Sequence, residues 1–154
     1  MGKVSVNVGD LIEAFDTHFD ETAYYLDLKT GEILFVSEYD NIDNLKERIE
    51  NDSTGRYVYI EPIPSPEGYR QMEDFIATVT DKNLQEKLEI AISGKGAFLR
   101  FKDVLISYPE ERQRWFDSHE NAMREYANEW VENLNWGLKR DSKSMYGGAI
   151  VWEK

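Results

Sequence analysis

The clearest pattern of hydrophobic and polar positions lies in the first quarter of the chain. Alternate positions from Tyr24 to Leu28 are hydrophobic, and the alternation resumes after a short polar break that contains Gly31. A period of two residues is typical of a half-buried β-strand, and glycine can adopt the left-handed conformation that closes a short hairpin loop. The pattern therefore predicts a β-hairpin formed by residues 22–28 and 32–37.

Shorter patterns on either side predict two more strands and two helices. Val4–Val6 alternates with polar neighbours as a short strand does, and Tyr57–Ile60 forms a third strand that ends before Pro62. Asn7 suits the N-cap of a first helix, since hydrophobic residues follow it at helical spacing. A thin apolar stripe predicts a second helix over residues 40–52.

The second half of the chain has helical spacing almost throughout and predicts four helices, the longest ending near Asn133. We expect Ser65 to cap the first of them, ahead of Pro66, and either Thr80 or Asp81 to cap the second. Gly96 opens the third, and Pro109 starts the longest. The fold class is therefore α+β: a small antiparallel sheet of about three strands, with flanking helices, precedes a four-helix C-terminal bundle. We expect residues 1–134 to form one domain. Residues 135–154 are expected to be an extension, with a polar linker and a strand-like end at 149–152.

Composition narrows the class of protein. The chain has 154 residues, 41% of them hydrophobic, which suits one domain. It has no cysteine, which excludes disulfides and thiolate chemistry, and no apolar run of the roughly 20 residues that a transmembrane helix needs. We expect a cytoplasmic protein without a membrane segment.

The excess of acidic residues is confined to the first part of the chain. Residues 1–93 hold 20 acidic and 8 basic side chains, a net charge of −12, whereas residues 94–154 hold 10 of each. An acidic surface repels the phosphate backbone, so we expect no general affinity for nucleic acid. Such a surface favours solubility, and it also fits attraction to a basic partner.

A set of short stretches along the chain forms a recognisable pattern. In chain order they are Asp10–Ala14, Tyr25–Ile33, Met72–Ile76, Leu84–Ala91, Gly94–Asp103, Trp115 and Glu129–Trp130. With these stretches the chain resembles the bacterial uncharacterised protein family 0158, over about residues 4–134. The resemblance implies no established activity and no catalytic residues, and the tail after Asn135 departs from the family's usual pattern.

A basic corner between two predicted helices is the best candidate site. Lys95, Arg100 and Lys102 are its cations, and Gly96 would expose free N–H groups at a helix start, where anions bind. Gly94 is expected to end the preceding helix with a positive φ, so Gly94→Val should be destabilising.

A purely structural interpretation of the same corner stays open. It is a tight helix–helix turn in which Phe98 and Phe101 enter the core and Arg100 pairs with Glu73 or Asp74. Those two carboxylates are also candidates for acid–base or metal chemistry. Adjacent helical residues diverge by about 100°, however, so a solvated face is favoured.

The histidines offer little chemistry. His18 and His119 each lie on an apolar stripe, where a hydrogen-bonded core residue is the usual role. Asp117, Ser118 and His119 have the letters of a catalytic triad, but consecutive helical residues do not face one another. We predict no metal site and no cofactor.

Three functions remain compatible with the sequence. The favoured one is a non-enzymatic acidic binding or interaction protein with a protein partner, self-association included. The second is an enzyme that acts on a small anionic substrate at the Lys95/Arg100/Lys102 corner, which a pocket joining this corner to Glu73 would favour. The third is an acidic inhibitor that mimics nucleic acid, which a flat, uniformly acidic N-terminal face would favour.

Overall fold

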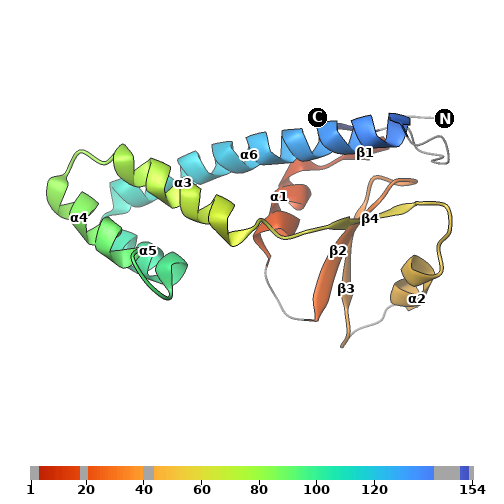
Figure 1. Ribbon diagram of the computed structural model, residues 1–154, viewed down its shortest axis with the longest axis horizontal. Helices are drawn as coiled ribbons and strands as arrows, with labels where there is room; N and C mark the ends of the chain where they lie inside the picture. The colour runs from red at the N-terminus through yellow and green to blue at the C-terminus, as the bar shows by residue number, and fades with distance from the viewer. Residues whose placement is uncertain (1–3, 18–20, 40–43, 141–149, 153–154) are drawn as a thin grey trace. The chain divides into compact units, whose positions relative to one another are not determined.

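The computed structural model describes residues 4–17, 21–39, 44–140 and 150–152 (Figure 1). The chain forms two compact units, one made of residues 1–62 and 124–154 and the other of residues 63–123. The longest helix, α6 (Pro109–Arg140), contributes to both units. The expected single domain over residues 1–134 stays a prediction.

Three antiparallel strands form the sheet of the first unit, as predicted (Figure 1). Tyr24 lies at its centre, opposite Phe35 on one side and Ile60 on the other. The hairpin and the third strand predicted from the sequence are confirmed. In spatial order the strands are β3 (Ile33–Ser37), β2 (Thr22–Asp27) and β4 (Tyr57–Ile60).

The two faces of this sheet differ in burial. Leu26 and Ile60 lie on one face and are fully buried. Tyr25 and Tyr59 lie opposite each other on the second face, with ring centroids 5.6 Å apart, and half of Tyr59 is exposed. The first face therefore contributes Leu26 and Ile60 to the core, whereas the second presents Tyr59 to solvent.

Helix α1 (Val8–Asp16) anchors the core of the first unit. The Asn7 side chain caps it by accepting the Asp10 N–H at 3.0 Å, which confirms the predicted cap. The fully buried Phe15 ring meets the rings of Tyr126 and Trp130 on α6 edge-on, at 4.9 and 5.8 Å between centroids. Aromatic pairs in this arrangement contribute beyond their buried area.

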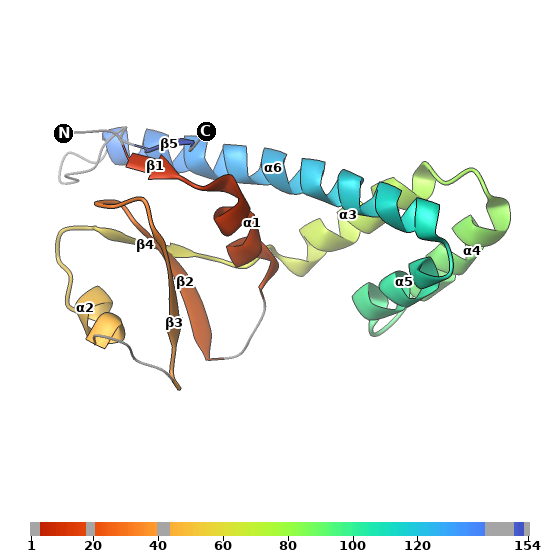
Figure 2. The same cartoon turned by 180° about the vertical axis from the view of Figure 1, so that it is seen from behind.

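A second, smaller sheet joins distant parts of the sequence. Strand β1 (Val4–Val6) pairs in parallel with β5 (Ile150–Trp152), so the strand expected near the C-terminal end is present (Figure 2). Of the polar linker predicted at residues 139–144, the first two, Lys139 and Arg140, belong to α6, and the others lie outside the described residues. Leu134 and Leu138 are half-buried and extend the helical stripe beyond Asn133, which is why the helix does not end there.

Helix α2 (Leu45–Glu50) is shorter than predicted. It begins after Asn44, which has a φ of 55°, and the first residues of the predicted range, 40–43, lie outside the described residues. None of its side chains is fully buried. Its thin apolar stripe therefore supports only a short helix at the surface of the first unit.

The second unit consists of the predicted four helices, including the part of α6 up to Met123. Its core centres on Phe75, Phe101 and Trp115, whose rings meet edge-on at 4.8–6.1 Å. Asp81 caps α4, whereas Pro64, not Ser65, is the N-cap of α3 and gives no side-chain cap. The other helices are α3 (Ser65–Ala77), α4 (Lys82–Ala91) and α5 (Ala97–Ile106).

Candidate functional site

The glycine corner between α4 and α5 is built differently from the prediction. Gly96, the N-cap of α5, has a φ of 73°, whereas Gly94 has no positive φ. The prediction for Gly94 is wrong because α4 ends without a left-handed residue. The Ser93 hydroxyl donates to the Ile90 carbonyl at 2.7 Å, and the Tyr69 hydroxyl donates to that of Ile92 at 3.0 Å. These bonds satisfy carbonyls that a glycine cap would otherwise serve.

We expect Gly96→Ala to lower the free energy of unfolding by about 1–2 kcal/mol, since the left-handed conformation disfavours a Cβ. No atom other than an Arg100 nitrogen, at 3.9 Å, lies within 4 Å of the added methyl group. Gly94→Ala is the matched control and should change stability by less than about 0.5 kcal/mol. Urea denaturation of both variants measures the difference, and equal effects would contradict the geometry.

The cations of the corner are not paired with the predicted acids. A guanidinium N–H of Arg100 donates to the carbonyl of Lys95, so this side chain folds back over its own loop. Within the described residues, the side chains of Lys95 and Lys102 have no hydrogen bond or ion pair. The expected pairing of Arg100 with Glu73 or Asp74 is not observed there.

Glu73 and Asp74 are both exposed on α3 and have no ion-pair partner among the described residues. This matches a solvated helix face. Within the part of the chain that the structure describes, no group of three histidine or acidic side chains lies close enough to hold a metal ion. The structure therefore does not assign chemistry to these two carboxylates.

Helix α5 places only one of its two predicted core phenylalanines inside. Phe101 is buried, whereas Phe98 is 43% exposed and lies over Gly68 at the start of α3. Phe101 meets the ring of Trp115 with 4.8 Å between centroids, whereas Phe98 lies against α3.

The outer side of α5 is an exposed apolar surface that was not predicted from the sequence. Leu99 and Ile106 are 66% and 63% exposed, although the opposite side of the same helix fills the core. Lys102 and Asp103 lie between them on the same face and are also exposed. We call Leu99, Lys102, Asp103 and Ile106 the outer stripe. In the sequence, the seven-residue spacing of Leu99 and Ile106 indicates that both lie on one face of this helix.

His119 is a hydrogen-bonded, half-buried residue, as expected for one of the two histidines. Its Nδ1 lies 2.8 Å from Oε1 of Gln71, and its ring stacks on Trp115 with centroids 5.3 Å apart. The neighbouring Ser118 is exposed on the same helix. His18 lies outside the described residues. The triad-like letters around His119 therefore form no nucleophile–base pair.

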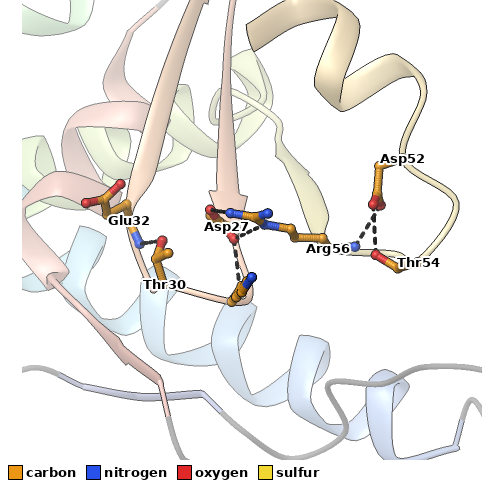
Figure 3. Close-up of polar contacts among 7 residues, drawn as sticks. Asp27, Thr30, Glu32, Asp52, Thr54 and Arg56 are labelled. Atoms are coloured by element: carbon orange, nitrogen blue, oxygen red, sulfur yellow. Dashed lines mark hydrogen bonds and ion pairs between the residues drawn. The ribbon is translucent and has the colours of Figure 1, made fainter. Parts of the chain in front are cut away.

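A buried ion pair in the first unit was also missed (Figure 3). Both carboxylate oxygens of Asp27 accept from the Arg56 guanidinium, at 2.8 Å each, and the Lys29 N–H donates to one of them at 2.9 Å. Burial by itself would raise the pKa of Asp27. The hydrogen bonds and charge of Arg56 and the Lys29 N–H outweigh this and hold the pKa below its usual value. This carboxylate is thus ionised and structural.

An open hollow of about 200 Å³ lies beside the exposed face of the sheet. Tyr25, Val36 and Ile49 form its apolar lining, and Glu38 holds Lys46 at 2.5 Å on its rim. That hydrogen bond raises the pKa of Lys46. The hollow is smaller than typical small-molecule sites, and it does not involve the basic corner.

The family of the chain follows from a comparison of its whole sequence. A model of the uncharacterised protein family UPF0158 matches residues 2–142. The chain belongs to this family. The resemblance expected over residues 4–134 is confirmed, and the match extends past Asn135, so part of the tail expected to depart from the family pattern lies within it. Strand β5 lies beyond the matched residues.

Its relatives are bacterial. A UPF0158 protein of Pseudomonas aeruginosa is 29% identical over 133 residues, which cover 86% of this chain and 85% of the relative. UPF0158 proteins of Chlamydia trachomatis and Chlamydia muridarum are each 25% identical over 127 residues, or 80% of this chain. The match spans only 38% of those two relatives. No solved structure matches the chain. Among the described residues, no helix is both long and apolar enough to span a membrane.

Proposed function

We propose that this chain is a protein-interaction module that binds its partner through the outer stripe of α5. The observation that supports the proposal is the exposure of Leu99 and Ile106, by about two thirds each, on a helix that already buries Phe101 and Leu105 on its other side. A surface helix of a monomer needs one apolar side only. Exposed apolar side chains flanked by charges are typical of contact surfaces.

Affinity capture from the native host tests this proposal. The bait carries Leu99→Ser together with Ile106→Ser, and the matched control is Ile90→Ser, which removes an equally exposed side chain from α4. We expect the wild type and the control to retain the same protein, and the double variant to lose it. Equal capture by all three baits would remove the outer stripe as the contact surface.

Anion binding at the glycine corner is a second candidate function. It is supported by Lys95 and Lys102, which have no partner in the described residues, and by the backbone N–H groups that open at Gly96. Against it stands Arg100, which already donates to the Lys95 carbonyl. An enzyme that acts on a small anionic substrate would need this corner as its binding site.

If the corner binds anions, phosphate or sulfate should raise the melting temperature of the protein. Ligand at about 100 times its Kd stabilises the folded state by roughly 2.7 kcal/mol. Lys95→Ala should keep the fold, because an exposed charged side chain contributes little to stability, and it should weaken the response. A thermal-shift assay with both anions checks this. An unchanged wild-type melting temperature would exclude the corner as a phosphate or sulfate site.

The nucleic-acid mimic is the weaker third proposal. Residues 1–62 hold 14 acidic and 5 basic side chains, a net charge of −9. The face of the sheet that carries Tyr25 nevertheless presents Tyr59, which is half exposed, to solvent. A uniformly acidic face, which mimicry requires, is therefore interrupted by an aromatic side chain.

A further inference from the structure

The outer stripe carries a charged pair between its two apolar residues. Leu99, Lys102, Asp103 and Ile106 follow the spacing i, i+3, i+4 and i+7, which puts all four on one helix face. All four are exposed. Within the described residues, neither Lys102 nor Asp103 has a side-chain ion pair or hydrogen bond. The charges are thus available to a partner together with the apolar side chains.

The outer stripe is complementary to a second copy of itself that runs in the opposite direction. In an antiparallel pair of α5 helices with a two-fold axis between positions 102 and 103, Leu99 faces Ile106 of the partner subunit. Lys102 then faces Asp103 of the partner subunit, and the symmetry makes each contact twice. We propose that the outer stripe binds a second copy of this chain in this antiparallel arrangement. The proposal rests on the proposed function, and it names the partner.

Charge favours a second copy over a partner of one sign. The centre of the stripe has one cation and one anion, so an acidic or a basic segment would oppose one of them with a like charge, which is unfavourable across an interface. Only a partner with the two charges in the reversed order pairs with both Lys102 and Asp103.

The second unit also has the smaller net charge: residues 63–123 hold 11 acidic and 8 basic side chains. Two copies therefore repel each other less through this unit than through residues 1–62.

The contact between the two helices is small, so we expect the dimer to have a low affinity. One helix pair built on two apolar residues from each side buries less area than a standard interface of about 1,600 Å². The dimer is therefore weak and dissociates on dilution. Concentration dependence, not a fixed oligomeric state, is the property to measure.

Sedimentation velocity of the full chain over about two orders of magnitude in concentration tests the dimer. We expect the wild type to shift from monomer to dimer as concentration rises. Leu99→Ser should abolish the shift, whereas the control Ile90→Ser on α4 should retain it. Leu99 is exposed, so this variant should still fold, and its thermal melt checks that.

Charge reversal tests the register itself. Lys102→Asp and Asp103→Lys each place like charges opposite each other twice, and each should weaken the dimer about tenfold. The double variant restores opposite charges and should recover wild-type affinity. An equimolar mixture of the two single variants should form a heterodimer, since every facing pair in it is then attractive. Glu125→Lys on α6 has the same charge change as Asp103→Lys and should have no effect.

Two results would overturn the proposal: a wild type that stays monomeric at every concentration, or a double variant that does not regain the affinity lost by the single ones. The proposed function is judged separately. A monomeric wild type that still captures a host protein, in a manner that Leu99→Ser with Ile106→Ser abolishes, keeps the interaction surface and removes the second copy. A monomer whose capture does not depend on these residues removes both.

Discussion

Gly31→Ala should destabilise the protein by roughly 2–5 kcal/mol, the largest effect that we expect from a single methyl group in this chain. The φ of 82° at Gly31 costs an alanine about 1–2 kcal/mol. The added Cβ would also overlap the Ser5 carbonyl oxygen and lie 2.7 Å from Cγ1 of Val4. Overpacking of this kind costs about 1–3 kcal/mol more, because β1 has to move away from the hairpin.

Gly55→Ala is the matched control for this experiment. Gly55 has nearly the same φ, 77°, but no atom lies within 4 Å of its added Cβ. Only the backbone cost of about 1–2 kcal/mol applies there. Urea denaturation of both variants measures their loss of stability. The difference between the two losses is the cost of the overlap between the added Cβ and β1. Equal losses of stability would mean that β1 does not lie over the hairpin turn.

Arg56→Ala should lower the free energy of unfolding by about 2–3 kcal/mol at neutral pH. It leaves the carboxylate of Asp27, 3% exposed, without its bidentate partner. Removing one member of a buried pair costs about 3–5 kcal/mol, and the 26% exposure of the Arg56 side chain places this case below that range. Arg70→Ala breaks the exposed pair with Glu67 and should cost under about 1 kcal/mol.

Acid should reduce the difference between Arg56→Ala and the wild type. The pKa of Asp27 in the folded protein lies below the ordinary value of 3.8, so the pair stabilises the wild type above that pH. This contribution is lost as the pH falls through the folded-state pKa, because the protonated carboxyl no longer needs the guanidinium. Stability curves of both proteins from pH 7 downward measure it. A difference that stays constant through the acid range would contradict an ionised Asp27.

The elements were largely predictable because each has a local signal. Alternation with Gly31 at the break predicted the hairpin, and Asn7 predicted a helix cap that the structure confirms. For α4 the sequence left Thr80 and Asp81 as alternatives, and the structure has Asp81 as the cap. Such signals depend on backbone preferences over a few residues, which a sequence contains completely. The exception is Gly94, where a glycine after a helix suggested a left-handed cap. Ser93 and Tyr69 satisfy the end of that helix instead.

The candidate surfaces were less predictable because they depend on distant residues. The spacing of Leu99 and Ile106 is visible in the sequence, but a helix with apolar residues on several sides does not reveal which side is covered. The packing of α5 against α4 and α6, with Phe101 against Trp115, decides that the outer stripe is exposed. The expected pairing of Arg100 with acids of α3 was wrong for the same reason, since it assumed a contact that only packing could supply.

The sequence by itself therefore determined the fold class, the strands, most of the helix starts and the family, because periodicity and capping act over short distances. The tertiary structure alone decided the partner of each charge and the exposed side of each helix. Asp27 and Arg56 are 29 residues apart and meet only because β4 pairs with β2. Position 31 requires a glycine for two reasons: the turn has a positive φ there, and β1 lies too close to leave room for a side chain. The second reason exists only in the folded chain.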